Sequence, residues 1–127
     1  MDKNILKDKS LNFAVRMMNL RSHLCETKHE FDVSKQILRS GTSIGAMQRE
    51  AFYAESDLDF IHKQAVAQKE CNETIDWLEV LYKSNYLTET EYNLLLADAT
   101  ELLKMITASI MTIKCRLKVD KSNKIQN

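Results

Sequence analysis

The chain has 127 residues, of which 44% are hydrophobic and 28% are charged, and its 18 Lys and Arg balance its 18 Asp and Glu. This length fits one domain. The charged fraction, and the lack of an apolar run near the roughly 20 residues of a membrane span, argue against a membrane protein. Because the polar first ten residues carry no signal-peptide core, we expect a cytoplasmic protein. We expect one domain over residues 1–127, with an ordered core of about residues 8–118 and a polar C-terminal tail.

The sequence contains no proline and only two glycines. Because the many tight turns of β-proteins use these two residues, their scarcity favours a few long helices. Short connections between long helices make neighbouring helices antiparallel. The sequence therefore predicts an all-α fold, an antiparallel up-down-up-down four-helix bundle with long helices.

The first predicted helix runs from about Lys9 to about Glu26, with Asp8 or Ser10 as its candidate N-cap. Apolar side chains recur near the 3.6-residue helical period, and they predict the face that packs on the core. These side chains are Leu11, Ala14, Val15, Met18 and Cys25.

The second predicted helix begins near Asp32, a good capping residue, and continues to about Ala54. Gly41 and Gly45 lie four residues apart on one face of it, where each costs about 1 kcal/mol relative to alanine. We interpret them as a site of close helix packing, because a phosphate-binding P-loop would require a Gly-Lys-Ser/Thr that is absent here. The apolar side of this helix consists of Val33, Ile37, Ile44 and Phe52.

The last two predicted helices have clear N-terminal signals. Ser56-x-x-Asp59 resembles a capping box at the start of the third helix, which ends near Ser84-Asn85. Thr88-x-x-Glu91 is a full capping box at the start of the fourth. Apolar residues then follow in alternating steps of four and three, a heptad seam that requires partner helices along its length. The seam consists of Tyr92, Leu96, Ala99, Leu103, Ile106, Ile110, Ile113 and Leu117.

Two runs carry a family resemblance, LRSGTSIGA over residues 38–46 and KECNETIDWL over residues 69–78. Together with the opening KDKS of residues 7–10, they resemble the 23S rRNA intervening-sequence protein family, a group of ribosomal-type four-helix-bundle proteins. The resemblance covers Ile5 to about Leu117. It implies a bacterial four-helix bundle related to accessory proteins of diversity-generating retroelements, which form five-membered rings and bind nucleic acid and a reverse transcriptase.

No residue pattern indicates a catalytic site, a metal site or a cofactor. Glu26-x-x-His29 and Asp59-x-x-His62 resemble halves of a di-iron site, but the helix directions place them at opposite ends of the bundle, on the order of 25 Å apart. Arg16 and His23 have a spacing found in some helical ribonucleases, and we interpret them as part of a polar helix face. The three cysteines form no C-x-x-C pair and are expected to be small buried hydrophobes.

Charge is divided along the chain. Residues 1–49 carry nine Lys or Arg and five Asp or Glu, residues 50–101 carry three and twelve, and residues 102–127 carry six and one. Because the first and fourth helices are neighbours in the predicted bundle, we expect a basic flank on these two helices. Such a flank can meet the acidic flank of another copy or contact nucleic-acid phosphates. The candidate nucleic-acid contacts are Lys7, Lys9, Arg16, Lys114, Arg116 and Lys118.

A second set of residues is a candidate for helix packing or subunit contact. Glu70, Glu73 and Trp77 share one helix face, and Arg39 is the expected partner of the two carboxylates. The complete set is Arg39, Gly41, Gly45, Glu70, Glu73 and Trp77.

The expected function is that of a non-enzymatic protein that assembles with itself into a ring, a pentamer according to the resemblance. RNA or DNA, and a reverse transcriptase by family analogy, are its other expected partners. A structural or protein-interaction module that binds no nucleic acid is the alternative, and a metal-independent ribonuclease is the lesser alternative.

Overall fold

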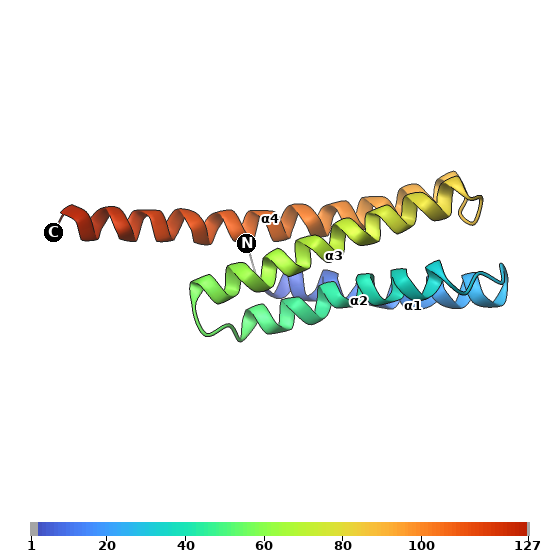
Figure 1. The fold of residues 1–127 in the computed structure, drawn as a ribbon, viewed down its shortest axis with the longest axis horizontal. Coiled ribbons are helices and arrows are strands. Elements are labelled where there is room, and N and C mark those ends of the chain that lie inside the picture. The colour runs from blue at the N-terminus through green and yellow to red at the C-terminus, as the bar shows by residue number, and fades with distance from the viewer. Residues whose placement is uncertain (1–2, 127) are drawn as a thin grey trace.

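The computed structural model describes residues 3–126, with side chains described from Ile5 to Asn123. The chain forms four helices: α1 (Lys3–Glu26), α2 (Val33–Phe52), α3 (Asp57–Lys83) and α4 (Glu89–Gln126) (Figure 1). Consecutive helices run antiparallel and pack against each other, so the predicted all-α four-helix bundle is confirmed. None of the helices in the described part is both long and apolar enough to cross a membrane.

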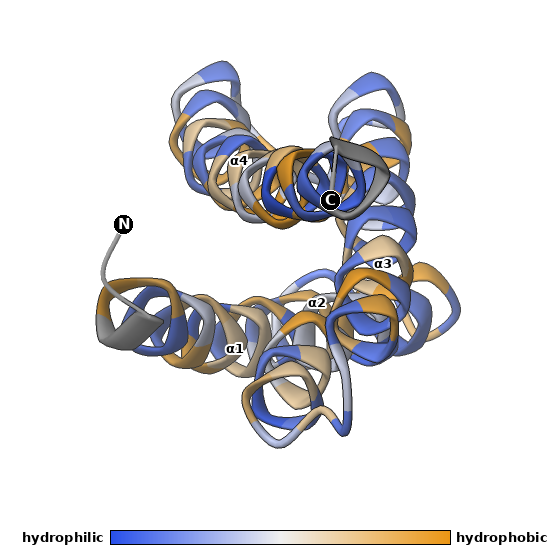
Figure 2. Cartoon of the chain, turned by 90° about the vertical axis from the view of Figure 1, so that its left-hand side faces the viewer, coloured by the Kyte–Doolittle hydropathy of each residue, from blue (hydrophilic) through white to orange (hydrophobic). Residues whose placement is uncertain are grey.

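The bundle is open along one edge. Viewed along its length, α1 and α4 lie on either side of this edge, and they contact each other less than any two consecutive helices do (Figure 2). The last part of α4 extends past the turn between α2 and α3 (Figure 1). We call residues 111–126 the α4 projection, because Ile110 is the last buried residue among the α4 side chains described, which end at Asn123.

The predicted core face of α1 is wrong. The helix begins at Lys3, and Ser10, a candidate N-cap, lies buried inside it. The buried side chains of α1 are Leu6, Phe13, Met17, Leu20 and Leu24. Both faces of α1 carry apolar residues at helical spacing, so periodicity alone did not distinguish them. The face with the larger apolar side chains is the one that packs on the core.

The start of α2 is capped by a residue that the sequence analysis missed. The buried Glu30 carboxylate accepts hydrogen bonds from the backbone N–H groups of Asp32, Val33 and Ser34, at 3.1, 3.1 and 2.7 Å. The side chain of Asp32, the predicted cap, makes no capping hydrogen bond. The longer side chain of a glutamate that precedes the helix can reach several N–H groups of the first turn. Its negative charge is also stabilised by the positive end of the helix dipole. At the other end of α2, Phe52 was predicted to lie on the apolar side of the helix. Its side chain is 57% exposed and does not join the core.

The starts of α3 and α4 follow the predictions closely. Ser56 Oγ accepts a hydrogen bond from the Asp59 N–H at 3.1 Å, although the Asp59 carboxylate accepts from the Glu55 N–H instead of completing the box. At α4, Thr88 and Glu91 form both bonds of the predicted capping box, at 2.8 and 3.1 Å. α4 then continues as a helix to Gln126, through the segment where we expected a polar tail.

Candidate functional site

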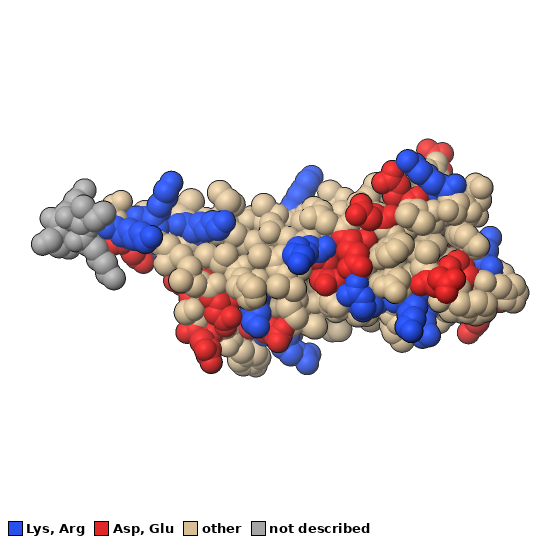
Figure 3. Space-filling model, in the orientation of Figure 1, with Lys and Arg blue, Asp and Glu red and all other residues tan. Residues whose placement is uncertain are grey.

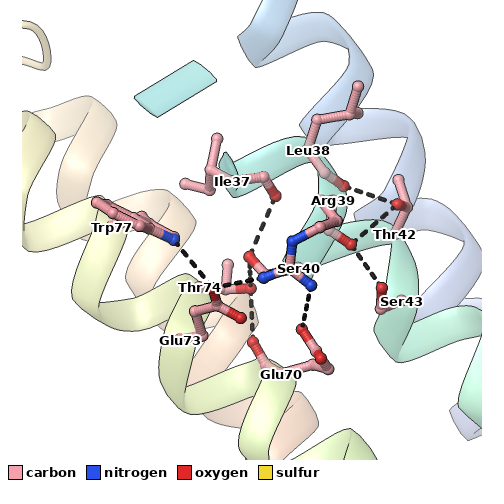
Figure 4. A network of polar contacts seen from close by, with 10 residues as sticks. All are labelled: Ile37, Leu38, Arg39, Ser40, Thr42, Ser43, Glu70, Glu73, Thr74 and Trp77. Atoms are coloured by element: carbon pink, nitrogen blue, oxygen red, sulfur yellow. Dashed lines mark hydrogen bonds and ion pairs between the residues drawn. The ribbon is translucent and has the colours of Figure 1, made fainter. Parts of the chain in front are cut away.

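Arg39 joins α2 to α3 through two carboxylates (Figure 4). Its guanidinium donates to Glu73 Oε1 at 2.5 Å and to Glu70 Oε2 at 3.4 Å, while the Trp77 Nε1–H also donates to Glu73 Oε1, at 3.4 Å. The hydrogen bond from Arg39 lowers the pKa of Glu73, whereas burial raises the pKa of Glu70. The structure therefore brings together all four of these predicted packing residues in one network.

Two buried polar pairs also connect α2 to α3, and neither was predicted from the sequence. Thr74 Oγ1 lies 2.8 Å from Ser40 Oγ, and the amides of Gln48 and Gln64 exchange two hydrogen bonds of 2.7 and 2.9 Å. Their spacing in the sequence could have indicated these pairs, because Ser40 and Gln48 lie on the same face of α2 as its buried apolar residues. The buried positions of that face are Ser34, Ile37, Ser40, Gly41, Ile44, Gln48 and Ala51.

Gly41 and Gly45 face α1 of the same chain. A Cβ on Gly41 would lie 2.9 Å from the Met17 sulfur, whereas a Cβ on Gly45 would come no closer than 3.6 Å to the Ser10 carbonyl oxygen. Neither glycine has a positive φ angle. A residue larger than glycine at position 41 would clash with Met17, because the two helices lie too close together there. Both glycines therefore contribute to packing within one chain.

Half of the six candidate nucleic-acid contacts form ion pairs with acidic side chains. Lys9 pairs with Glu101 at 2.6 Å, Arg16 pairs with Asp98, and Arg116 pairs with Asp57 at 2.8 Å. The other three, Lys7, Lys114 and Lys118, are exposed and form no ion pair among the described residues.

The helix register explains these pairs. α1 lies beside the acidic first half of α4. The expectation that the basic residues of α1 lie next to the basic end of α4 is therefore wrong. That end is the α4 projection, where Lys114, Lys118 and Lys121 recur on one helix face. Figure 3 shows this basic group at the end of α4, with acidic side chains over the nearby turn between α2 and α3.

A groove between α1 and α4 contains two pockets. The first has a volume of about 220 Å³ and lies between Phe13 and Leu102, and the second has about 260 Å³ and lies between Leu20 and Leu95. Arg16 lines both pockets. His23 lines the second one, so the Arg–His pair of the ribonuclease alternative is brought into a single pocket, with Arg16 held by Asp98.

The outer face of α1 carries a row of exposed apolar side chains. Leu11, Val15 and Met18 are 60%, 53% and 52% exposed and follow one another at steps of four and three residues. This spacing places them on one helix face. We call them the α1 row, and they are three of the five residues that we expected to pack on the core.

The candidate metal-ligating and thiol groups are placed as follows within the described part of the chain. No group of three or more His, Cys, Asp or Glu within residues 3–126 could hold a metal ion. Cys25 is half-buried and Cys71 is buried, and desolvation raises the pKa of Cys71 to about 12. Cys115, which we expected to be buried, is exposed on the α4 projection.

The comparisons with known proteins decide the family. The family of the 23S rRNA-intervening sequence protein matches residues 2–108. This chain belongs to that family. A crystal structure at 1.70 Å resolution of a protein of unknown function from the S23 ribosomal protein family, from Bacteroides thetaiotaomicron VPI-5482, is similar to the chain. It has 50% sequence identity and a TM-score of 0.86, and the match covers 87% of this chain and 99% of that chain. No curated protein matches the chain.

The family match ends before the α4 projection. Residues 111–126 lie beyond position 108, the last residue that the family description covers. The Arg39 network, both glycines and the α1 row lie within the match. The projection therefore lies outside the part of the chain that matches the family.

Proposed function

We propose that this member of the 23S rRNA-intervening sequence protein family is a non-enzymatic building block that assembles with copies of itself through the outer face of α1. The observation that carries the proposal is the α1 row, in which Leu11, Val15 and Met18 are more than half exposed. An apolar stripe at helical spacing that packs on nothing within its own chain is typical of a contact surface. A closed ring, pentameric as the resemblance implies, satisfies such a contact in every copy.

Charged residues at the edges of the α1 row support a specific contact. Lys7 and Arg21 lie along one edge of the row, and Asp8 and Glu26 lie along the other, all exposed and without ion pairs among the described residues. Oppositely charged edges orient a partner surface and reject the reversed arrangement. The row therefore combines an apolar centre with a polar rim, as stable interfaces do.

Sedimentation velocity of the purified chain over a range of salt concentrations tests this proposal. The unchanged chain is expected to sediment as one oligomer, and Val15→Asp is expected to sediment as a monomer because it would bury an unpaired charge in the contact. Val119→Asp is the matched control, since Val119 is 58% exposed on the α4 projection. A monomeric unchanged chain, or a Val15→Asp variant with the same mass as the unchanged chain, would refute the proposal.

A second candidate function is binding of RNA or DNA by the α4 projection. It is favoured by the row of Lys114, Lys118 and Lys121, which meets no acidic partner in the described part of the chain. Lysines on one helix face can follow a phosphate backbone, and their binding weakens as salt rises because counterions are released. No Phe, Trp or Tyr occurs among residues 111–126, so the contact would be to phosphates and not to bases.

Filter binding of single-stranded RNA and duplex DNA between about 50 and 200 mM salt tests this second function. The double variant Lys114→Glu/Lys118→Glu is expected to lose retention, whereas Lys35→Glu, at an exposed position of α2, is expected to retain it. Retention that does not depend on salt, or that survives the double substitution, would contradict the assignment. In that case the chain acts as an interaction module alone.

A further inference from the structure

The groove between α1 and α4 repeats with the period of a coiled coil. Every α1 residue that lines the second pocket lies seven positions after one that lines the first. Seven residues make two helical turns, so the pockets lie roughly 10 Å apart along the helix. The first set is Lys9, Asn12, Phe13 and Arg16, and the second is Arg16, Asn19, Leu20 and His23.

The α4 side of the groove shows the same repeat. Three α4 residues of the first pocket, Asp98, Glu101 and Leu102, correspond to Glu91, Leu94 and Leu95 of the second, again seven positions apart. The apolar members at the base of the pockets, which are Phe13, Leu20, Leu95 and Leu102, are only 2–7% exposed. Holes that repeat every seven residues between two packed helices are the holes that receive the side chains of a further helix.

The two walls of the groove carry opposite charge. Basic residues Lys9 and Arg16 line the α1 wall, and acidic residues Glu91, Asp98 and Glu101 line the α4 wall. Two ion pairs connect the walls, but their side chains remain 39–51% exposed. Such exposed pairs contribute little to stability, so exchanging them for pairs with a bound helix costs little.

We propose that this groove binds an amphipathic helix of a partner protein. The helix would place apolar side chains seven residues apart in the two pockets, acidic side chains along the α1 wall and basic side chains along the α4 wall. Leu94, which is 57% exposed at the rim, would be covered by it. No residue of the α1 row lines either pocket, so this site is separate from the proposed assembly contact.

Fluorescence anisotropy with a synthetic peptide helix tests the site on the full chain. The probe has leucines at heptad spacing, glutamates along one edge and lysines along the other, and it is used at a concentration too low for it to pair with itself. Two control peptides carry glutamates on both edges or lysines on both edges. The mixed-edge peptide is expected to bind at least about tenfold more tightly than either control, because only it complements both walls.

Two substitutions of exposed α4 residues locate the binding. Leu94→Lys, at the rim of the groove, is expected to weaken binding of the mixed-edge peptide about tenfold. Met111→Lys, at a position that is 54% exposed and outside both pockets, is expected to leave binding unchanged. Absence of binding, equal binding of all three peptides, or an inert Leu94→Lys would overturn the proposal. A loss of oligomer mass in Leu94→Lys but not in Met111→Lys would also overturn it, by identifying a second copy as the occupant.

Discussion

Gly41 of α2 packs directly against the side chain of Met17 of α1. Met17 is fully buried, and a Cβ on Gly41 would lie 2.9 Å from its sulfur and closer still to its Cγ. Because the close atoms are in the middle of a buried side chain, they cannot swing into solvent. The contact sets how near the two helices can approach at this level of the bundle.

Replacing each glycine by alanine should give opposite results. Gly45→Ala should stabilise the fold by about 0.5–1 kcal/mol, since the added methyl makes an ordinary contact and alanine favours the helix. Gly41→Ala gains the same helix propensity but forces overpacking that costs about 1–3 kcal/mol. Urea denaturation measures the change in the free energy of unfolding for both variants, provided that the slope of this free energy against urea concentration is the same. Equal stability of the two variants would show that the space around Met17 is not limiting.

The buried Gln48–Gln64 pair should behave as a unit. Gln64→Leu would leave the Gln48 amide without its partner, which costs about 1–3 kcal/mol, whereas the double variant Gln48→Leu/Gln64→Leu removes both amides and should be nearly neutral. A double-mutant cycle by urea denaturation gives the coupling energy. A double variant that loses the sum of the two single losses would mean that the amides contribute independently.

Some local signals in the sequence predicted local structure correctly. The Thr88–Glu91 capping box could be predicted because its spacing and residue types define the hydrogen bonds by themselves. The Arg39 contacts could be predicted because helix spacing places the two glutamates on one face. The capping box depends only on residues close together in the sequence, and the Arg39 contacts depend only on the packing of α2 against α3.

Features set by the register between distant helices could not be predicted. Lys9 lies opposite Glu101 because α4 extends past the start of α1, and the pattern within either helix alone does not predict that offset. The exposed face of α1 was assigned to the core for a related reason. An exposed apolar face and a buried one have the same apolar periodicity in one helix, so Val15 and Met17 cannot be told apart by pattern.

The stability of the bundle should fall in acid. The Thr88 N–H hydrogen bond lowers the pKa of Glu91, and the Arg39 hydrogen bond lowers the pKa of Glu73, both below the usual 4.5. A carboxyl with a lowered pKa stabilises the fold above its unfolded-state pKa, and this contribution is lost as the pH falls through the folded value. Burial raises the pKa of Glu70, so protonation of this carboxyl as the pH falls favours the folded chain. Loss of stability should therefore begin below about pH 4.5.

Glu91→Gln isolates one part of this acid dependence. The variant should melt below the unchanged chain near neutral pH. The difference should be smaller at a second pH well below 4.5, because the Glu91 carboxylate of the unchanged chain becomes protonated as the pH falls through its lowered pKa. Glu50→Gln, at an exposed position of α2, is the control and should show no such change. A Glu91→Gln difference that is the same at both pH values would assign its effect to packing and not to charge.

The three cysteines should differ sharply in reactivity toward a thiol reagent such as dithionitrobenzoate. Cys115 is exposed and should react at once at mildly alkaline pH, whereas Cys71 is buried with a pKa raised to about 12 and should react only when the chain unfolds. Cys115→Ser should remove the fast phase and leave the slow ones. If the fast phase survives that substitution, the α4 projection does not expose Cys115. If Cys115 in the assembled protein is protected, the projection is covered by another copy, which would place it inside the assembly contact.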